Sequence, residues 1–292
     1  MAKESRLEGI KRANLWRRVI VKDVLKSVDG NPGVVPARAF ICEDDREVLS
    51  TLVNKKSFQK EAYRFHFELP PEPWQGNPLK AKVIILTLNP GYVYRSNTIS
   101  ARLLKMAGYA ESIAGFKSRV LRLKEDSMMP PQMTKIDKKA ISLFDAFNTL
   151  GDWYWVDKLR ELREAYIERR KNENGRISVV ELENEFYKKI AVVEYCAYTS
   201  QSFSDSKLIE DLPSVKYVKE MIRQIESEGK ALFVILRAER KWGKVLKDKS
   251  RCIVNTNLSQ NLSKKNLNSK KGVLDKGIIA PFDVILDRLL EK

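Results

Sequence analysis

Four short apolar runs constrain the fold of this chain more strongly than any other feature of its sequence. They are KVIILTL from Lys82, KIAVVEY from Lys189, ALFVIL from Ala231 and RCIVN from Arg251. Each run is apolar on both faces of a strand, as is typical of parallel strands that helices cover on both sides. Between the second and third runs, a helix is expected to begin at Pro213 and to end before Gly229. The alternation predicts an α/β fold built on a parallel sheet.

The 292 residues are expected to form one α/β domain with two helical additions. Residues 1–60 are charged and periodic, which predicts an N-terminal helical extension, and residues 61–292 carry the α/β domain. A charged insertion at about residues 151–189 is predicted to be mostly helical, because its apolar residues recur at helical spacing. The apolar stripe consists of Leu159, Leu162, Tyr166 and Ile167.

The chain is strongly basic, and this bears on its partners. Its 54 Lys and Arg against 38 Asp and Glu give a formal charge of +16, an excess expected of a protein that meets a polyanion. Nucleic acid is the leading partner, although a basic surface can also serve solubility alone. The charged N-terminus lacks the apolar core of a signal peptide, and the longest apolar runs are too short to cross a bilayer. We therefore expect a cytoplasmic protein that binds DNA and no membrane.

Cysteine and histidine are scarce, which removes several kinds of chemistry. The three cysteines are dispersed and lack CxxC spacing, so they predict neither a disulfide framework nor a four-cysteine metal site. Any histidine-based triad would have to use the single His66, which is expected to be a packed residue. The adjacent acids at residues 43–45 could suggest a metal site, but neighbouring acids in a loop are usually solvated. No metal or other cofactor is expected.

Polar residues follow each of the four apolar runs. In an open parallel sheet, ligands bind beyond the carboxyl ends of the strands, where the connecting loops gather. The segments at these ends are residues 89–92, 194–200, 237–242 and 255–266. Together they offer carboxamides, a carboxylate, aromatic rings, hydroxyls and cations, which are groups suited to hold a flat polar ring beside a phosphate chain.

The stretch LTLNPGY, which ends at Tyr92, resembles the first motif of the uracil-DNA glycosylase superfamily, whose water-positioning Asp or Asn sits at this strand end. VVEYCAYTS, LFVILRAERKW and NLSQNLSKKN are similar, in the same order, to later blocks of a divergent bacterial branch of that superfamily. The resemblance covers about residue 65 to the C-terminus and leaves the first sixty residues unexplained. It implies a three-layer α/β/α fold around a short central parallel sheet, and a DNA glycosylase.

The resemblance gives the water-positioning role to Asn89 and one side of the base pocket to Pro90, Gly91 and Tyr92. A carboxamide is a poor base, but an oxocarbenium-like sugar needs a positioned water more than a deprotonated one. Asn-Pro-Gly also makes turns readily, and a turn without catalysis remains the alternative for Asn89.

Glu194 stands at or next to the position where members of the superfamily use an Asn to read the base edge. A carboxylate accepts a hydrogen bond from an exocyclic amino group and repels the carbonyl of uracil, so Glu194 points away from uracil. The alternative is an ion pair with a nearby cation. Tyr195 or Phe203 could supply the second wall of the base pocket.

The fourth block lacks the histidine that stabilises the leaving base elsewhere in the superfamily. Asn255 and Asn257 are candidates for that role as neutral donors, and Leu258 or Leu262 could be a wedge that enters the minor groove. The neighbouring cations would bind phosphates, or they could form an ordinary solvated surface. The predicted DNA contacts are Arg237, Arg240, Lys241, Lys244, Ser259, Gln260, Asn261, Leu262, Ser263, Lys264 and Lys265.

These features predict a monofunctional DNA glycosylase that hydrolyses the N-glycosidic bond of a modified pyrimidine and leaves an abasic site. Ordinary cytosine cannot be the target, because the host genome would be destroyed. A hypermodified, glucosylated hydroxymethylcytosine of phage DNA fits, and its excision would serve anti-phage defence. Three alternatives stay open: a housekeeping repair glycosylase for uracil or deaminated bases, a metal-dependent nuclease, and a DNA-binding module without catalysis.

Overall fold

The computed structural model describes residues 41–65, 67, 71, 73–90, 155, 158–173, 175–255, 262–268 and 281–291, together with Leu15. The chain forms two compact units. Unit 1 consists of Met1–Pro73, Leu88–Ser127 and Glu194–Gln224, and unit 2 consists of Trp74–Thr87, Met128–Val193 and Ile225–Lys292. Each unit is therefore assembled from segments that lie far apart in the sequence.

A five-stranded sheet in the order β1-β3-β2-β4-β5 forms the centre of unit 2, although the last residue of β3 is grouped with unit 1. β2 pairs in parallel with β4, and β4 with β5, so that Ile85, Val234 and Ile253 lie side by side. The short β1 pairs antiparallel with β3 at one edge. The strand bounds are β1 Trp74–Gln75, β2 Val83–Thr87, β3 Ile190–Glu194, β4 Leu232–Leu236 and β5 Cys252–Asn255.

The four longer strands coincide with the four apolar runs, which confirms the predicted α/β class. Every residue of β2, β3 and β4 is buried, as strands with both faces covered require. β1 differs from the expectation of a purely parallel sheet. Its two residues are too few to leave a periodic pattern in the sequence.

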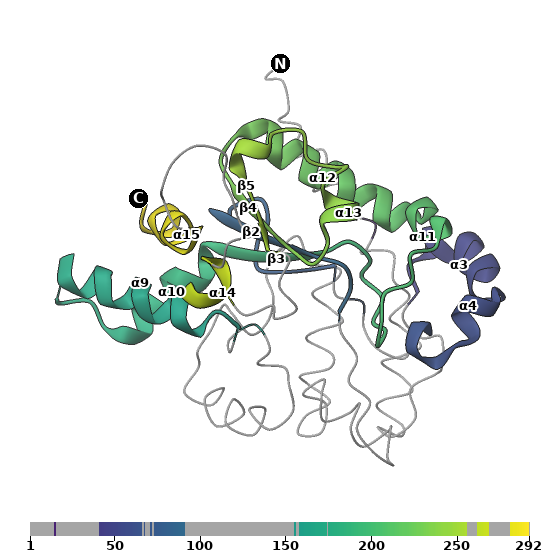
Figure 1. The fold of residues 1–292 in the computed structure, drawn as a ribbon, viewed down its shortest axis with the longest axis horizontal. Helices are drawn as coiled ribbons and strands as arrows, with labels where there is room; N and C mark the ends of the chain where they lie inside the picture. Colours follow the sequence, from purple (N-terminus) through teal and green to yellow (C-terminus); the bar gives the residue numbers. More distant parts are fainter. Residues whose placement is uncertain are drawn as a thin grey trace, which may run out of the picture. The chain divides into compact units, whose positions relative to one another are not determined.

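Helices of unit 2 pack on one face of its sheet. In Figure 1, α9, α10, α14 and α15 lie together at the left of the strands. Alternate strand residues, including Val83, Ile85 and Val234, share an apolar cluster with Leu162 and Phe186 of these helices. The helix bounds in unit 2 are α9 Arg160–Glu173, α10 Val179–Lys188, α13 Glu239–Trp242, η4 Lys249–Arg251, α14 Lys264–Leu267 and α15 Pro281–Leu290.

The predicted helical insertion contains the two helices α9 and α10. α10 starts with a capping box, in which the Ser178 hydroxyl accepts from the Glu181 N–H at 3.2 Å and the Glu181 carboxylate accepts from the Ser178 N–H at 3.1 Å. The predicted apolar stripe is buried or packed against the core, which confirms it: Leu159, Leu162, Tyr166 and Ile167.

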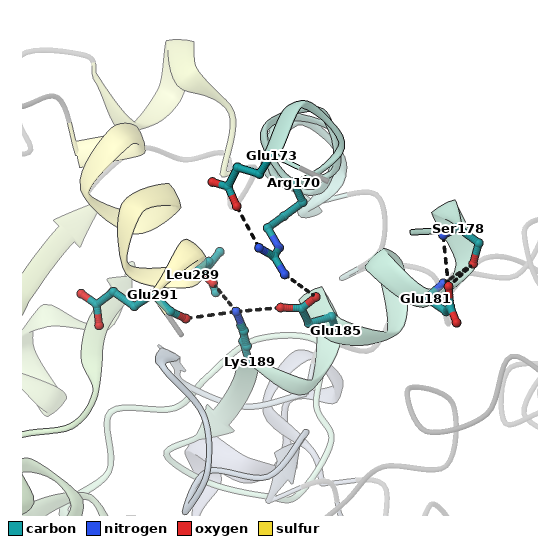
Figure 2. Close-up of polar contacts among 8 residues, drawn as sticks. All are labelled: Arg170, Glu173, Ser178, Glu181, Glu185, Lys189, Leu289 and Glu291. Atoms are coloured by element: carbon teal, nitrogen blue, oxygen red, sulfur yellow. Dashed lines mark hydrogen bonds and ion pairs between the residues drawn. The ribbon is translucent and has the colours of Figure 1, made fainter. Parts of the chain in front are cut away.

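Lys189 connects α10 with the C-terminal helix of unit 2 (Figure 2). Its ammonium lies 3.1 Å from Glu185 Oε1 and donates to the carbonyl oxygens of Leu289 at 2.7 Å and Glu291 at 3.2 Å, at the end of α15. Arg170 of α9 reaches the same Glu185 at 3.4 Å. A cation at a helix C-terminus satisfies carbonyls that have no partner within the helix. This network holds α9, α10 and α15 together.

Unit 1 contains a cluster of aromatic rings made by Phe58, Phe65, Phe67 and Tyr198, with neighbouring ring centroids 5.3 to 5.8 Å apart. α12 begins at Pro213 and its last residue precedes Gly229, as predicted, although its residues from Ile225 onward are grouped with unit 2. Residues 43–59, in the expected N-terminal extension, are largely helical. The remaining helix bounds are η2 Glu43–Asp45, α3 Arg46–Val53, α4 Lys56–Gln59, η3 Glu61–Tyr63, α11 Lys207–Asp211 and α12 Pro213–Glu228.

Candidate functional site

The order of the strands shows a change in the direction of winding. From β2 the chain proceeds to β3 on one side of β2, and then to β4 on its other side. The direction of winding therefore reverses beside β2. In open α/β sheets, ligands bind beyond the carboxyl ends of the strands at such a switch point. The segment that follows β2 contains Asn89.

Hydrogen bonds within unit 1 hold the side chain of Asn89. Its Nδ2 donates to Ser200 Oγ at 2.9 Å and lies within hydrogen-bond distance of the backbone carbonyl oxygens of Pro90, at 3.1 Å, and Ser200, at 3.2 Å. Carbonyl oxygens only accept hydrogen bonds, so the amino group of the carboxamide must face them. The orientation of the carboxamide is thereby fixed.

The Oδ1 atom of Asn89 is left as an acceptor. In the part of the chain that the structure describes, no group donates a hydrogen bond to this atom, and the side chain is half-buried. A fixed amide oxygen can hold a water or a hydroxyl in one position, although it cannot remove a proton from it. A turn alone does not require a fixed side-chain acceptor of this kind.

Ser200 belongs to the loop after β3 and is the main partner of the carboxamide. Its N–H donates to the Pro90 carbonyl at 3.3 Å. Its buried hydroxyl, which accepts from Asn89, donates in turn to the Ser202 carbonyl at 2.9 Å. Because this hydroxyl both accepts and donates, its rotation is fixed. Ser200 carries no signal in the sequence that would mark this role, since a serine in a polar loop leaves no pattern.

Glu194 and Tyr195 both lie at the end of β3, and both are buried. Glu194 is 7% exposed, and its N–H donates to the Pro73 carbonyl at 3.0 Å. The Tyr195 ring packs edge-on against Phe203 with 6.2 Å between centroids, and the Lys219 ammonium lies 5.9 Å from its centre. Burial raises the pKa of Tyr195 above its usual value. Tyr195 therefore packs in the interior, whereas Phe203 is half-buried.

Asp45 corrects the expectation that the acids of η2 are solvated. Its side chain is fully buried, where Oδ2 accepts from the Tyr198 hydroxyl at 2.7 Å and Oδ1 from the Ser214 N–H at 2.9 Å. The Cys42 N–H donates to the same hydroxyl at 3.2 Å. Burial raises the pKa of Asp45, and hydrogen bonds from Ser214 and Tyr198 offset part of the rise. Asp45 thus ties the N-terminal segment to the loop after β3 and to the start of α12.

Arg237 directly follows β4, and Asn255 is the last residue of the neighbouring parallel strand β5 in unit 2. Asn255 is 5% exposed, and its carbonyl oxygen accepts from the Arg237 N–H at 3.1 Å. Arg237 is exposed and has a φ of +57°, and among the described residues it is the one non-glycine with a positive φ. This left-handed conformation costs an L-residue ~1–2 kcal/mol. Such strain often persists at functional sites.

Arg237→Gly is expected to raise the free energy of unfolding by about 0.5 kcal/mol, because relief of the left-handed strain outweighs the extra backbone entropy of glycine. Urea unfolding measures the change. Arg240→Gly is the matched control, since Arg240 is an exposed cation inside α13 and should lose about 1 kcal/mol there. Equal losses in both variants would show that Arg237 carries no strain.

The short helix α13 follows Arg237 and carries further cations. Trp242 is fully buried, and its Nε1 donates to the Thr87 carbonyl at 2.7 Å, which attaches α13 to the end of β2. Lys241 is only 8% exposed. A phosphate contact needs an accessible cation, so Lys241 does not suit the predicted contact with DNA. Arg240 and Lys244 are exposed.

Leu262 is fully buried in the core of unit 2. A wedge has to be exposed to enter DNA, so the expectation of a wedge at Leu262 is corrected to a core position. Ser263 caps α14, because its hydroxyl accepts from the Asn266 N–H at 3.3 Å. Lys264 and Lys265 in the same helix are exposed.

Several predicted site residues lie outside the described residues, and their roles stay predictions: Gly91, Tyr92, Asn257, Leu258, Ser259, Gln260 and Asn261. Within the described ranges, no group of three or more His, Cys, Asp or Glu side chains is arranged to hold a metal ion. No helix in those ranges combines the length and the apolar surface of a membrane span.

Comparisons with protein families, with curated proteins and with solved structures found no match to this chain. A functional assignment therefore rests on the residues themselves and on the contacts that they make.

Proposed function

We propose that the chain is a monofunctional DNA glycosylase that hydrolyses the N-glycosidic bond of a modified pyrimidine and leaves an abasic site. The observation that carries the proposal is the Asn89 carboxamide, whose amino group is held by Ser200 and Pro90 and whose Oδ1 remains an acceptor. This arrangement supports a positioned water at the carboxyl end of β2. The resemblance of LTLNPGY to the first motif of the uracil-DNA glycosylase superfamily supports the same role.

The proposed reaction needs an oriented water more than a strong base. The bond between C1′ of the deoxyribose and the base nitrogen breaks, and its electron pair leaves with the base. The water held by Asn89 Oδ1 adds to C1′, and its proton passes to solvent or to the departing base. Because the oxocarbenium-like sugar is strongly electrophilic, a neutral carboxamide is sufficient for this step.

Glu194 supports an amino-bearing base as the substrate. The carboxylate is buried at the end of β3. A phosphate stays at the surface, but a base turned out of the stack enters the protein interior, where Glu194 would accept a hydrogen bond from its exocyclic amino group. A uracil carbonyl in the same place would face a second acceptor with little water to separate them, which is costly. The target must also be marked, since ordinary cytosine occurs throughout the host genome. Glucosylated hydroxymethylcytosine of phage DNA meets both conditions, so we assign the enzyme to anti-phage defence in the cytoplasm.

We also propose that the α/β fold is the three-layer α/β/α arrangement of that superfamily. The helices α9, α10 and α15, which cover one face of the sheet in unit 2, would form one of the two outer layers. The exposed cations after β4 and in α14 support contacts with phosphates. They are Arg237, Arg240, Lys244, Lys264 and Lys265.

Product analysis in EDTA tests the proposed function. Phage DNA that contains glucosylated hydroxymethylcytosine is incubated with the protein, and half of each sample is then treated with hot alkali, which breaks abasic strands. A monofunctional glycosylase should yield breaks only after alkali and without any metal ion. Breaks before alkali that depend on added magnesium would instead identify a nuclease. Intact DNA in both halves would leave a binding module.

Ser200→Ala is expected to lower the single-turnover rate of base release about three- to tenfold. The variant removes one neutral hydrogen bond to Asn89, a contribution of ~0.5–1.5 kcal/mol, while the two carbonyl acceptors remain. Ser204→Ala is the control, because Ser204 is buried in the same loop but makes no hydrogen bond to Asn89. Equal rates for both variants and the wild type would exclude Ser200 from the positioning of Asn89.

A further inference from the structure

A group of exposed cations lies in unit 1, whereas the DNA contacts that the sequence predicts belong to unit 2. We call residues 55–64 the basic segment; it carries Lys55, Lys56, Lys60 and Arg64, all exposed. None of these four cations forms an ion pair with any described side chain. A surface cation that is not paired with any of these described side chains is available to a polyanion.

Three other cations of unit 1 do form ion pairs with acids close to them in the sequence. Arg46 pairs with Glu43 at 3.1 Å, Lys216 with Asp211 at 3.7 Å, and Arg223 with Glu220 at 3.6 Å. These surfaces are locally neutralised by acids three to five residues away. The basic segment has four cations and one acid, Glu61, so its own sequence leaves a net positive charge.

Buried aromatic rings fix the backbone of the basic segment. Phe58 is 4% exposed and lies 5.3 Å from Phe65, which is 5% exposed. Phe65 in turn lies 5.5 Å from the ring of Tyr198, in the loop after β3. The cations between and beside these two phenylalanines are thus presented from an ordered base, which lowers the entropic cost of binding a ligand.

A short chain of hydrogen bonds leads from the catalytic candidate to the basic segment. Asn89 Nδ2 donates to Ser200 Oγ at 2.9 Å, and the same hydroxyl donates to the Ser202 carbonyl at 2.9 Å. The Ser202 N–H then donates to the carbonyl of Ala62 at 2.7 Å. Ala62 lies midway between Lys60 and Arg64 in the sequence. The basic segment is therefore attached to the loop that orients the Asn89 carboxamide.

We infer that the basic segment is a contact surface for the sugar-phosphate backbone of the DNA strand that enters the Asn89 site. The inference rests on the proposed function, because it takes DNA as the ligand of that site. Contacts to phosphates set the register of a protein on DNA without reading sequence. A cationic surface joined to the carboxamide would hold the strand beside the position where the nucleotide is turned out of the stack. This gives a role to part of the N-terminal sixty residues.

The test uses the full chain with Lys55, Lys56, Lys60 and Arg64 all replaced by Gln. Affinity for an unmodified duplex is measured by fluorescence anisotropy at several salt concentrations. Removal of one phosphate-binding cation should reduce the slope of log K against log salt by about 0.9 on duplex DNA. We expect a slope lower by about two to three and an affinity at low salt at least about tenfold weaker.

The matched control replaces four exposed cations of α9 and α10 and the loop between them, where acids stand among the cations: Arg160, Lys171, Arg176 and Lys188. It lowers the net charge by the same amount and should leave the slope within about one of the wild type. Equal slopes for the two variants would overturn the inference, since total charge alone would then explain the binding.

Base release measured on the same samples separates this inference from the proposed function. A slope that falls only in the variant of the basic segment supports the contact surface, even if no DNA loses a base and the glycosylase proposal fails. Base release by the wild type with equal slopes for both variants would leave the glycosylase standing and remove the contact surface.

Discussion

Asn89→Ala is expected to lower the rate of base release at least about a hundredfold, as happens when a group that orients a reactant is removed. The variant keeps the backbone of the turn but removes the acceptor that would hold the water. Folding and DNA affinity should stay close to those of the wild type, because the side chain is half-buried and its partners are neutral. Single-turnover assays at saturating protein measure the rate without a contribution from binding.

Two further variants separate catalysis from turn formation. Asn77 forms a turn before β2, where its Oδ1 accepts from the Leu79 N–H at 3.1 Å. Asn77→Ala should therefore lower stability by about 1 kcal/mol and leave base release unchanged. Asn89→Asp would put a carboxylate oxygen against the carbonyls of Pro90 and Ser200, so the side chain should no longer keep its fixed orientation. Normal base release by Asn89→Ala would reduce Asn89 to a turn residue.

Glu194→Gln is expected to lower base release from an amino-bearing pyrimidine by about ten- to a hundredfold, corresponding to the ~1–3 kcal/mol of discrimination that a well-formed contact to a base edge provides. A carboxylate only accepts hydrogen bonds, whereas a carboxamide can donate one to a carbonyl. Release of uracil, measured in parallel, should fall less or rise. The ratio of the two kcat/KM values reports the change in preference.

Glu226→Gln is the matched control for this substitution. Glu226 is also a buried glutamate, and its Oε1 accepts from the N–H groups of Lys247 at 2.6 Å and Asp248 at 2.7 Å. Its replacement should reduce stability without changing the preference between bases. The same fall for both bases in Glu194→Gln would mean that Glu194 supports the fold and does not read the base.

The strands could be predicted because each is a continuous apolar run between polar segments, and burial on both faces leaves that signature. α12 could be predicted in the same way, since Pro213 and Gly229 mark its two ends. The pairing of β1 with β3 could not be predicted from the sequence. β1 is followed by Gly76, which has a φ of +82°, and any other residue there would place a Cβ 2.3 Å from the Ile190 carbonyl oxygen. Nothing in the local sequence reveals that contact.

The position of Asn89 after β2 follows from the sequence, but the contacts that orient its carboxamide do not. Ser200 lies 111 residues further along the chain, and only the folded loop brings its hydroxyl to Asn89. Asp45 is misread for a similar reason, because three adjacent acids look solvated until Tyr198 and Ser214 are seen to enclose one of them. Long-range polar contacts leave no periodic pattern, so the structure is needed to find them.

Mass spectrometry of the bases released in EDTA tests the central claim most directly. The wild-type protein is incubated with DNA that carries glucosylated hydroxymethylcytosine, with unmodified DNA and with uracil-containing DNA, and Asn89→Ala serves as the blank. We predict release of the glucosylated base from the first DNA only, at a rate at least about a hundredfold above the blank. Release of uracil alone would contradict the proposed substrate, and release of no base from any of the three would contradict base excision itself.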